Sequence, residues 1–309
     1  MLKCQPLSPD RTVKSRDAYE SPEGVGFESQ SGSQASDQIH PLHGLARRWS
    51  PPPSSASADA RDPVLAELIG EVLRDAESVG VLLNGSRAVG CARPDSNYDL
   101  IWIVEDRAYE RRSDRVTLVE HRLRADSPAI EITYENVETL RRLSHDGETS
   151  GAAFASSSVL VDKTGEIVPL ITAIAARTGK LARERVAEEY DSYLNGFLHS
   201  LKSWSRGDDL GARAHAAESG LHLVKALFGL EGVVAPYPDQ WSARLAELDA
   251  QGWQPGFFQT AVLRLLYAPD PPFQQMLERR VGRLMESRGV RHQWRYDLQR
   301  LRAVKYDEL

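Results

Sequence analysis

A Gly-Ser pair set between two apolar runs constrains the fold of this chain more than any other feature. The first run covers residues 80–83, the pair Gly85-Ser86 follows it, and the second run covers residues 98–104. Side chains alternate between the two faces of a strand, so Asn97 and Asp99 are expected on one face at the start of the second run. A turn that offers backbone N–H groups beside an acidic strand edge suits a phosphate chain neutralised by a divalent cation.

With these residues the chain resembles the nucleotidyltransferase superfamily, which has the DNA polymerase β-like fold. The signature of that superfamily is Gly-Ser, a short helix, then Ser-Asp-x-Asp. Here it reads Gly85-Ser86 followed by Ser96-Asn97-Tyr98-Asp99. The resemblance implies that Gly85 and Ser86 contact the phosphates of a nucleoside triphosphate (NTP) substrate, and that Asp99 holds Mg²⁺ (or Mn²⁺).

The chain departs from the signature at Asn97, where the superfamily places its first metal-binding Asp. An amide oxygen can ligate a hard cation, but it adds no negative charge, and Mg²⁺ sites depend on charged oxygens. The departure leaves the fold inference in place and weakens the inference of catalysis. By the resemblance, Asn97 is expected as a neutral ligand next to the metal and the nucleotide.

A third acidic residue follows in the segment 129–134, which alternates apolar and polar residues as a half-buried strand does. Ile130 and Ile132 would face the core, and Glu131 would point to the opposite face. A helix is expected next, over residues 136–143. In this order the resemblance implies that Glu131 binds metal or accepts the proton of the attacking hydroxyl. The alternative is a solvent-exposed Glu on an edge strand.

Length and composition predict a chain with three parts. A chain of 309 residues favours two domains and an appendage. Residues 1–60 are rich in Ser, Pro, Gly and Gln without a sustained apolar period, so they are expected to form a disordered extension. The resemblance implies an α+β fold, with a small mixed-sheet nucleotidyltransferase domain over 61–168 and an all-α helical-bundle domain for substrate or partner binding over 169–309.

Charge and cysteine content indicate the compartment and exclude some partners. The net charge of −6 argues against a general nucleic-acid binder, because such proteins are typically basic. Two cysteines, Cys4 and Cys91, provide no disulfide framework. The sequence shows neither a run long enough for a membrane span nor a secretory signal. The chain is therefore expected in the cytoplasm, without a membrane partner.

Local patterns predict where individual elements begin and end. The Asp62-Pro63 pair suits the start of a helix. Residues 105–115 are expected to be a charged connector, and residues 116–123 a strand. The turn 163–166 after an apolar run signals a hairpin. Helices are expected from residue 171, then over 181–205, 212–230, 242–248, 257–266, 273–285 and 294–304.

The segment 215–228 carries a polar stripe of His215, Glu218, His222 and Lys225 at helical spacing. Such a stripe is usually a solvated face, but Lys225 could instead line a cleft and meet a triphosphate. A helix ending in Leu-Phe and a Pro-x-x-x-Trp turn, here 236–241, resemble the helical second domain of kanamycin-type nucleotidyltransferases. Many of those proteins carry a basic residue before the Trp, where this chain has Gln240.

The resemblance implies a Mg²⁺-dependent enzyme that transfers a nucleoside monophosphate (NMP), AMP from ATP in the first instance. The acceptor would be a hydroxyl of a small molecule, such as an aminoglycoside-like compound, or of a protein. The alternative, suggested by Asn97, is a nucleotide-binding or scaffold protein that keeps this fold and has lost turnover.

Overall fold

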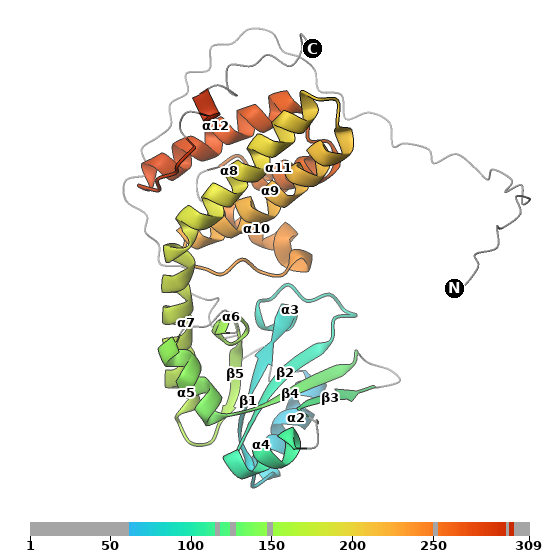
Figure 1. Ribbon diagram of the computed structural model, residues 1–309. Helices are drawn as coiled ribbons and strands as arrows, with labels where there is room; N and C mark the ends of the chain where they lie inside the picture. Colours follow the sequence, from blue (N-terminus) through green and yellow to red (C-terminus); the bar gives the residue numbers. More distant parts are fainter. Residues whose placement is uncertain are drawn as a thin grey trace, which may run out of the picture. The chain divides into compact units, whose positions relative to one another are not determined.

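The computed structural model describes residues 62–114, 118–123, 128–146, 151–249, 253–294 and 297–299. The predicted disordered extension 1–60 and most of the helix expected over 294–304 lie outside these residues. The described chain contains a five-stranded mixed sheet with helices packed on it, followed by a run of helices (Figure 1). This arrangement confirms the predicted α+β fold class.

The sheet has the strand order β3-β4-β2-β1-β5. Its strands are β1 (Ser78–Asn84), β2 (Tyr98–Val104), β3 (Val119–Arg122), β4 (Ile130–Asn136) and β5 (Ser158–Asp162). Only the β2–β4 pair is parallel; the pairs β1–β2, β1–β5 and β3–β4 are antiparallel. Consequently the first residues of β2 and β4 lie at the same end of the sheet as the last residues of β1 and β3.

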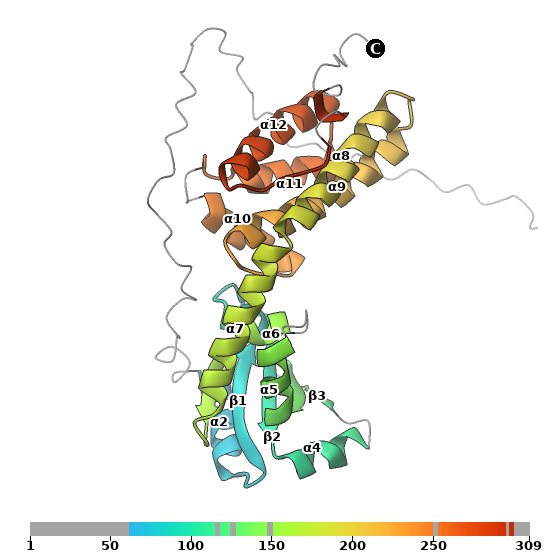
Figure 2. The same cartoon turned by 60° about the vertical axis from the view of Figure 1, so that its left-hand side comes forward.

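Helices cover both faces of this sheet, which explains why β1 and β2 read as nearly continuous apolar runs. Tyr98, Leu100 and Trp102 of β2 share a core with α2 (Pro63–Arg74) and α4 (Asp106–Ser113). Ile101 and Ile103 face the other way, into a core with α5 (Val137–Asp146), α6 (Gly151–Ala155) and α7 (Ile167–Glu184). Figure 2 shows α5, α6 and α7 together on one side of the strands.

Helix α2 begins as the sequence predicts. One oxygen of Asp62, Oδ1, accepts hydrogen bonds from the backbone N–H groups of Val64 (2.9 Å) and Leu65 (3.3 Å), and Pro63 occupies the first turn. This is an N-cap, which satisfies donors that the helix itself cannot use. The other oxygen, Oδ2, accepts a 2.7 Å hydrogen bond from the Tyr98 hydroxyl at the start of β2.

Three local predictions were wrong. The connector 105–115 contains helix α4. The turn 163–166 leads into α7 and not into a second strand, because the Asp162 carboxylate accepts from the N–H groups of Gly165 and Val168. The helix expected over 181–205 is two helices, α7 and α8 (Val186–Trp204), with Arg185 between them. The domain division at residue 168 stays a prediction; it falls in the first turn of α7.

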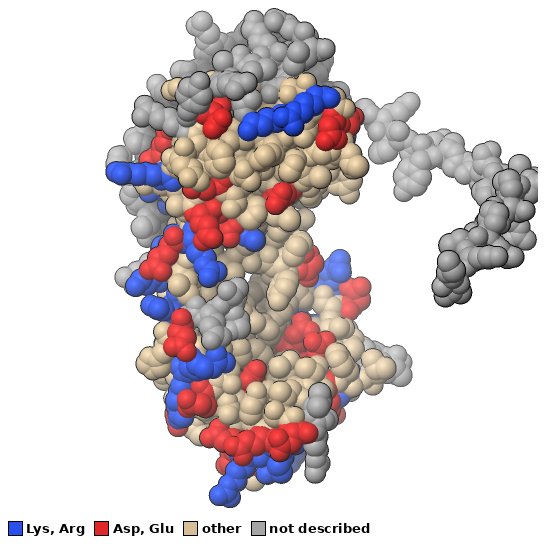
Figure 3. Space-filling view, viewed as in Figure 1, with Lys and Arg blue, Asp and Glu red and all other residues tan. Residues whose placement is uncertain are grey.

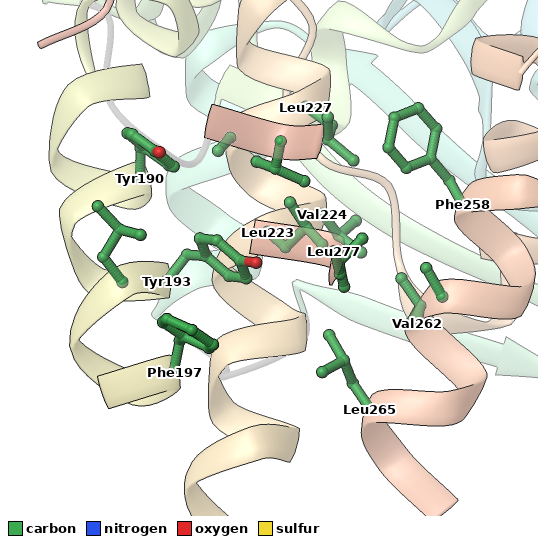
Figure 4. Packing of buried hydrophobic residues seen from close by; sticks show 14 of the residues in the cluster. Tyr190, Tyr193, Phe197, Leu223, Val224, Leu227, Phe258, Val262, Leu265 and Leu277 are labelled. Carbon is green, nitrogen blue, oxygen red and sulfur yellow. The ribbon is translucent and has the colours of Figure 1, made fainter. Parts of the chain in front are cut away.

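The helices after α7 share a large apolar core (Figure 4). They are α8, α9 (Asp209–Leu230), the short 3₁₀ helix η1 (Pro238–Gln240), α10 (Trp241–Asp249), α11 (Phe257–Tyr267) and α12 (Pro271–Ser287). Tyr190, Tyr193 and Phe197 stack along α8, with ring centroids 6.0 and 6.5 Å apart. Full burial of the Phe197 side chain contributes about 1.5–3 kcal/mol. No helix of the described residues is long and apolar enough to cross a membrane.

Candidate functional site

Four polar residues lie side by side across the sheet, at the edge where β2 and β4 begin. Asn84 of β1 pairs with Asp99 of β2, Asp99 pairs with Glu131 of β4, and Glu131 pairs with His121 of β3. Residues paired in this way project to the same face of a sheet. We call these four side chains the cross-strand row; their order across the strands is Asn84, Asp99, Glu131 and His121.

The Gly-Ser turn lies directly against the Asp99 carboxylate. Gly85 opens the four-residue helix α3 (Gly85–Ala88) with a φ of +66°, which other residues rarely adopt. A Cβ atom at this position would be 2.0 Å from Asp99 Oδ2, well inside van der Waals contact. Glycine is therefore required at position 85 for two reasons, the backbone angle and the room for Asp99.

Asp99 is a half-buried carboxylate beside a second carboxylate. Burial raises the pKa of Asp99 above its ordinary value, the charge of Glu131 raises it further, and that of Asp239 adds to the same direction. The charge of Arg87 lowers this pKa and offsets part of the effect. Two like charges held together in this way are destabilising unless a cation neutralises them.

Glu131 is the more accessible member of the pair. Its Oε2 lies 3.5 Å from His121 Nδ1, and 45% of the Glu131 side chain is exposed. A contact between groups this exposed contributes little to stability. The Glu131 carboxylate is thus partly open to solvent beside His121, while Asp99 lies close to the backbone of Gly85.

The remaining predicted site residues lie in different surroundings. Ser86 follows Gly85 in α3, and its carbonyl accepts a 2.8 Å hydrogen bond from Cys91. Asn97 is exposed at the entrance to β2. Lys225 lies on α9, where its Nζ is 4.0 Å from Glu189 Oε2, an oxygen that is also 2.7 Å from His222 Nδ1. The described contacts of Lys225 are thus with α8, and its meeting with a triphosphate stays a prediction.

Sequence reasoning missed two residues of this region, His121 and Arg87. Residues 116–123 were predicted as a strand, but nothing in the sequence gives the register that brings His121 next to Glu131. Arg87 stands inside the signature run, two residues after Gly85. Its guanidinium contacts the backbone at residues 96 and 97, which only the folded chain shows.

The donor set can be compared with the needs of particular metals. Among the described residues, no three His, Cys, Asp or Glu side chains are grouped to hold a metal ion. The two carboxylates of the cross-strand row, with Asn97 two residues before Asp99, do not make a closed cage. Mg²⁺ is typically bound through one or two carboxylates together with substrate phosphates. The residues present therefore fit a Mg²⁺ ion that binds with a nucleotide.

Comparison with known proteins finds no sequence match and a weak structural similarity. No protein-family model matches the chain, and no curated protein sequence matches it. Among solved structures it is similar to a nucleotidyltransferase-like protein from Exiguobacterium sibiricum, with 13% identity, a TM-score of 0.38 and 76% of each chain covered. A likeness at this level carries no argument about function.

Proposed function

We propose that this chain is a Mg²⁺-dependent nucleotidyltransferase. It would transfer an NMP, AMP from ATP in the first instance, to a hydroxyl of a small molecule or of a protein. One observation carries the proposal: Asp99 and Glu131 are paired on adjacent parallel strands, and Asp99 lies against Gly85 of the Gly-Ser turn. A phosphate-binding turn and two adjacent carboxylates are what transfer between phosphate and hydroxyl requires.

Each residue has a distinct role in this scheme. The turn at Gly85 and Ser86 receives the phosphates, with Gly85 allowing a close backbone approach. Asp99 would hold Mg²⁺ with Asn97 as a neutral ligand, and Glu131 would either join them or accept the proton of the attacking hydroxyl. When bound, Mg²⁺ neutralises phosphate charge and orients the in-line displacement. Lys225 is proposed as a further phosphate contact on the strength of the family resemblance alone.

The transfer itself forms one bond and breaks one. The acceptor oxygen attacks the α-phosphorus, and the bond from that phosphorus to the bridging oxygen breaks, so pyrophosphate leaves. Where Glu131 is not itself bound to the metal, the acceptor proton would pass to its carboxylate, which is 45% exposed and so within reach of an acceptor. An aminoglycoside-like acceptor is suggested only by the resemblance of the helical half.

A second candidate is a nucleotide-binding protein of the same fold without turnover. The observation that favours it is Asn97, because a neutral amide replaces a charged ligand. Burial and then the charge of Glu131 raise the pKa of Asp99. In this case too, a bound cation would relieve the part of the effect that comes from repulsion between Asp99 and Glu131. The two candidates therefore share nucleotide binding and differ only in the release of pyrophosphate.

The test is ordered to separate these candidates. Thermal shift is measured with ATP, with Mg²⁺ or Mn²⁺, and with both; the proposal expects the largest shift with both. Pyrophosphate release and transfer of α-labelled AMP are then followed with aminoglycosides and with co-expressed protein as acceptors. Asp99→Ala should abolish pyrophosphate release and AMP transfer. Asp95→Asn, which changes a side chain that is 81% exposed, should leave both unchanged.

Binding without pyrophosphate release in the parent would favour the second candidate, most clearly if Asn97→Asp then gains activity. If neither ATP nor the metal shifts the melting temperature, both candidates are wrong.

A further inference from the structure

The guanidinium of Arg87 is committed to the backbone at the entrance of β2. Its Nε donates to the carbonyls of Ser96 (3.2 Å) and Asn97 (3.1 Å), and its Nη2 donates to the Ser96 carbonyl at 2.7 Å. A planar fork of donors suits two adjacent acceptors, which a lysine ammonium cannot match in geometry. Arg87 therefore fixes the path of the two residues that precede Tyr98.

The same guanidinium is stacked on an aromatic ring. Its Cζ lies 3.8 Å from the centroid of the Tyr98 ring. Tyr98 is 5% exposed, and its hydroxyl donates to Asp62 Oδ2, the carboxylate that caps α2. A cation over a desolvated aromatic face contributes about 1–2 kcal/mol. The position of Arg87 is thus held from two sides, by carbonyls and by a ring that is itself anchored.

Arg87 and Asp99 act from opposite faces of the sheet. Tyr98 and Asp99 are consecutive in β2, so their side chains project in opposite directions. The guanidinium, resting on Tyr98, therefore lies behind the strand that carries Asp99. It can influence the cross-strand row through the backbone at 96–97 and through α3, whose first residue, Gly85, contacts Asp99.

We propose that Arg87 is a positioning residue for the cation and nucleotide site. It ties α3 to the entrance of β2, and thereby holds Asn97 and Asp99 against the Gly-Ser turn in the geometry that Mg²⁺ needs. This inference rests on the proposed function. It assigns to Arg87 an effect on metal affinity that precedes, and does not require, contact with a phosphate.

The test measures Mn²⁺ binding without nucleotide, by the loss of the free Mn²⁺ signal in electron paramagnetic resonance. The proteins are the parent, Arg87→Lys, Tyr98→Phe and the control Arg93→Lys, whose side chain is 80% exposed. Arg87→Lys keeps the charge and loses the fork, so it should weaken Mn²⁺ binding by about 10-fold, the lower end for residues that orient ligands. Tyr98→Phe should weaken it less, and Arg93→Lys not at all.

Outcomes are read at a temperature where circular dichroism shows each variant folded. If Arg87→Lys binds Mn²⁺ like the parent, the inference is overturned and the proposed function stands. If that variant loses only ATP affinity, measured by calorimetry, Arg87 is a phosphate ligand and the inference is equally overturned. If Arg87→Lys does not fold, the Mn²⁺ affinity of Tyr98→Phe is the test, and an affinity equal to that of the parent overturns the inference. A parent that binds neither Mn²⁺ nor ATP overturns the proposed function itself.

Discussion

Asp99 in the sheet and Glu189 in the helical half lie in opposite electrostatic surroundings. In the helical half, Glu189 lies 2.7 Å from His222 and 4.0 Å from Lys225, and Glu231 lies 3.2 Å from Arg288. In the sheet, by contrast, Asp99 is paired across the strands with another carboxylate, and its pKa is raised. Figure 3 shows Lys and Arg side chains beside Asp and Glu side chains over the described residues of one face.

The difference separates a carboxylate that is paired with cations from one that lies beside another carboxylate. A paired carboxylate is stabilised by its cation in the folded protein. A half-buried carboxylate next to a like charge destabilises the fold unless a cation neutralises it, and groups with perturbed pKa values often gather at functional sites. The comparison predicts that substitutions in the sheet affect metal and nucleotide binding, and that those in the helices affect them far less.

Asp99→Asn should have the largest effect. Losing the charge of a direct ligand should weaken Mn²⁺ binding by more than the roughly 10- to 100-fold that changes around a ligand typically cost. In buffer with a chelator, however, the variant should melt at a higher temperature than the parent at pH 7.5, because the repulsion with Glu131 is gone. A variant that loses metal binding and also melts lower would break the comparison, since Asp99 would then be a structural group.

The pH dependence of this effect follows from the direction of the Asp99 shift. The folded pKa lies above the ordinary value of 3.8, so the folded protein binds this proton more tightly than the unfolded chain does. The free energy of unfolding therefore falls as pH rises from about 3.8 through the raised pKa, and the penalty is complete above it. The gain in melting temperature of Asp99→Asn should be present at neutral pH and shrink on acidification, measured by thermal melts in chelator.

Gly85→Ala should have the next largest effect. The left-handed backbone costs an alanine about 1–2 kcal/mol, and its Cβ would also displace Asp99. Gly90→Ala is a matched control, because Gly90 has a φ of +72° but nothing within 4 Å of the position of a Cβ. Both variants should lose stability in denaturant titrations, and only Gly85→Ala should also lose Mn²⁺ binding. Equal Mn²⁺ binding by both would mean that Asp99 is not fixed by the turn.

Asn97→Asp should sharpen the comparison by adding a third acidic residue. Because Mg²⁺ favours charged oxygens, Mn²⁺ binding should tighten by about 10-fold, equivalent to about 1.4 kcal/mol. The control is Asn195→Asp at an exposed position of α8, which changes the net charge equally. Unchanged Mn²⁺ affinity would show that the side chain at position 97 does not reach the cation. Mn²⁺ affinity is measured by electron paramagnetic resonance of the free ion, as for Arg87→Lys.

Lys225→Ala should have the smallest effect, and it tests whether the helical half takes part at all. If Lys225 meets the triphosphate, ATP should bind about 10-fold more weakly, as expected for a lost hydrogen bond to a charged group, with no change for Mn²⁺ alone. Lys180→Ala removes the same charge from a residue that lies 3.6 Å from Glu184. Equal ATP affinities in the two variants, by calorimetry, would leave Lys225 as a surface partner of Glu189.

Sequence patterns predicted the fold where local physics decides it. The strand over residues 98–104 and the start of α2 at Asp62-Pro63 were correct, because a buried strand and an N-cap each leave a local signal. The turn at 163–166 was misread, because an Asp that accepts backbone hydrogen bonds begins a helix as readily as a hairpin. The break at Arg185 was missed, since apolar spacing continues across it.

The candidate site was predictable only in part, for the same reason. Asp99 and Gly85 are close in sequence, and the signature run relates them. Glu131 was inferred from its order in the chain, but its pairing with Asp99 depends on strand register, which no local pattern gives. His121 and Arg87 depend entirely on tertiary contacts, the first across an edge strand and the second on two backbone carbonyls.

The register of β4 against β2 has a consequence for how such a site can change over time. Ile130 and Ile132 flank Glu131 and are 1% and 0% exposed, so a slip of one residue would turn both outward and drive the carboxylate into the core. The buried isoleucines on either side, and not the carboxylates themselves, therefore fix the position of Glu131 next to Asp99. Position 97 lies exposed at the entrance to β2, so it can gain or lose a charge by a single substitution while this register is kept.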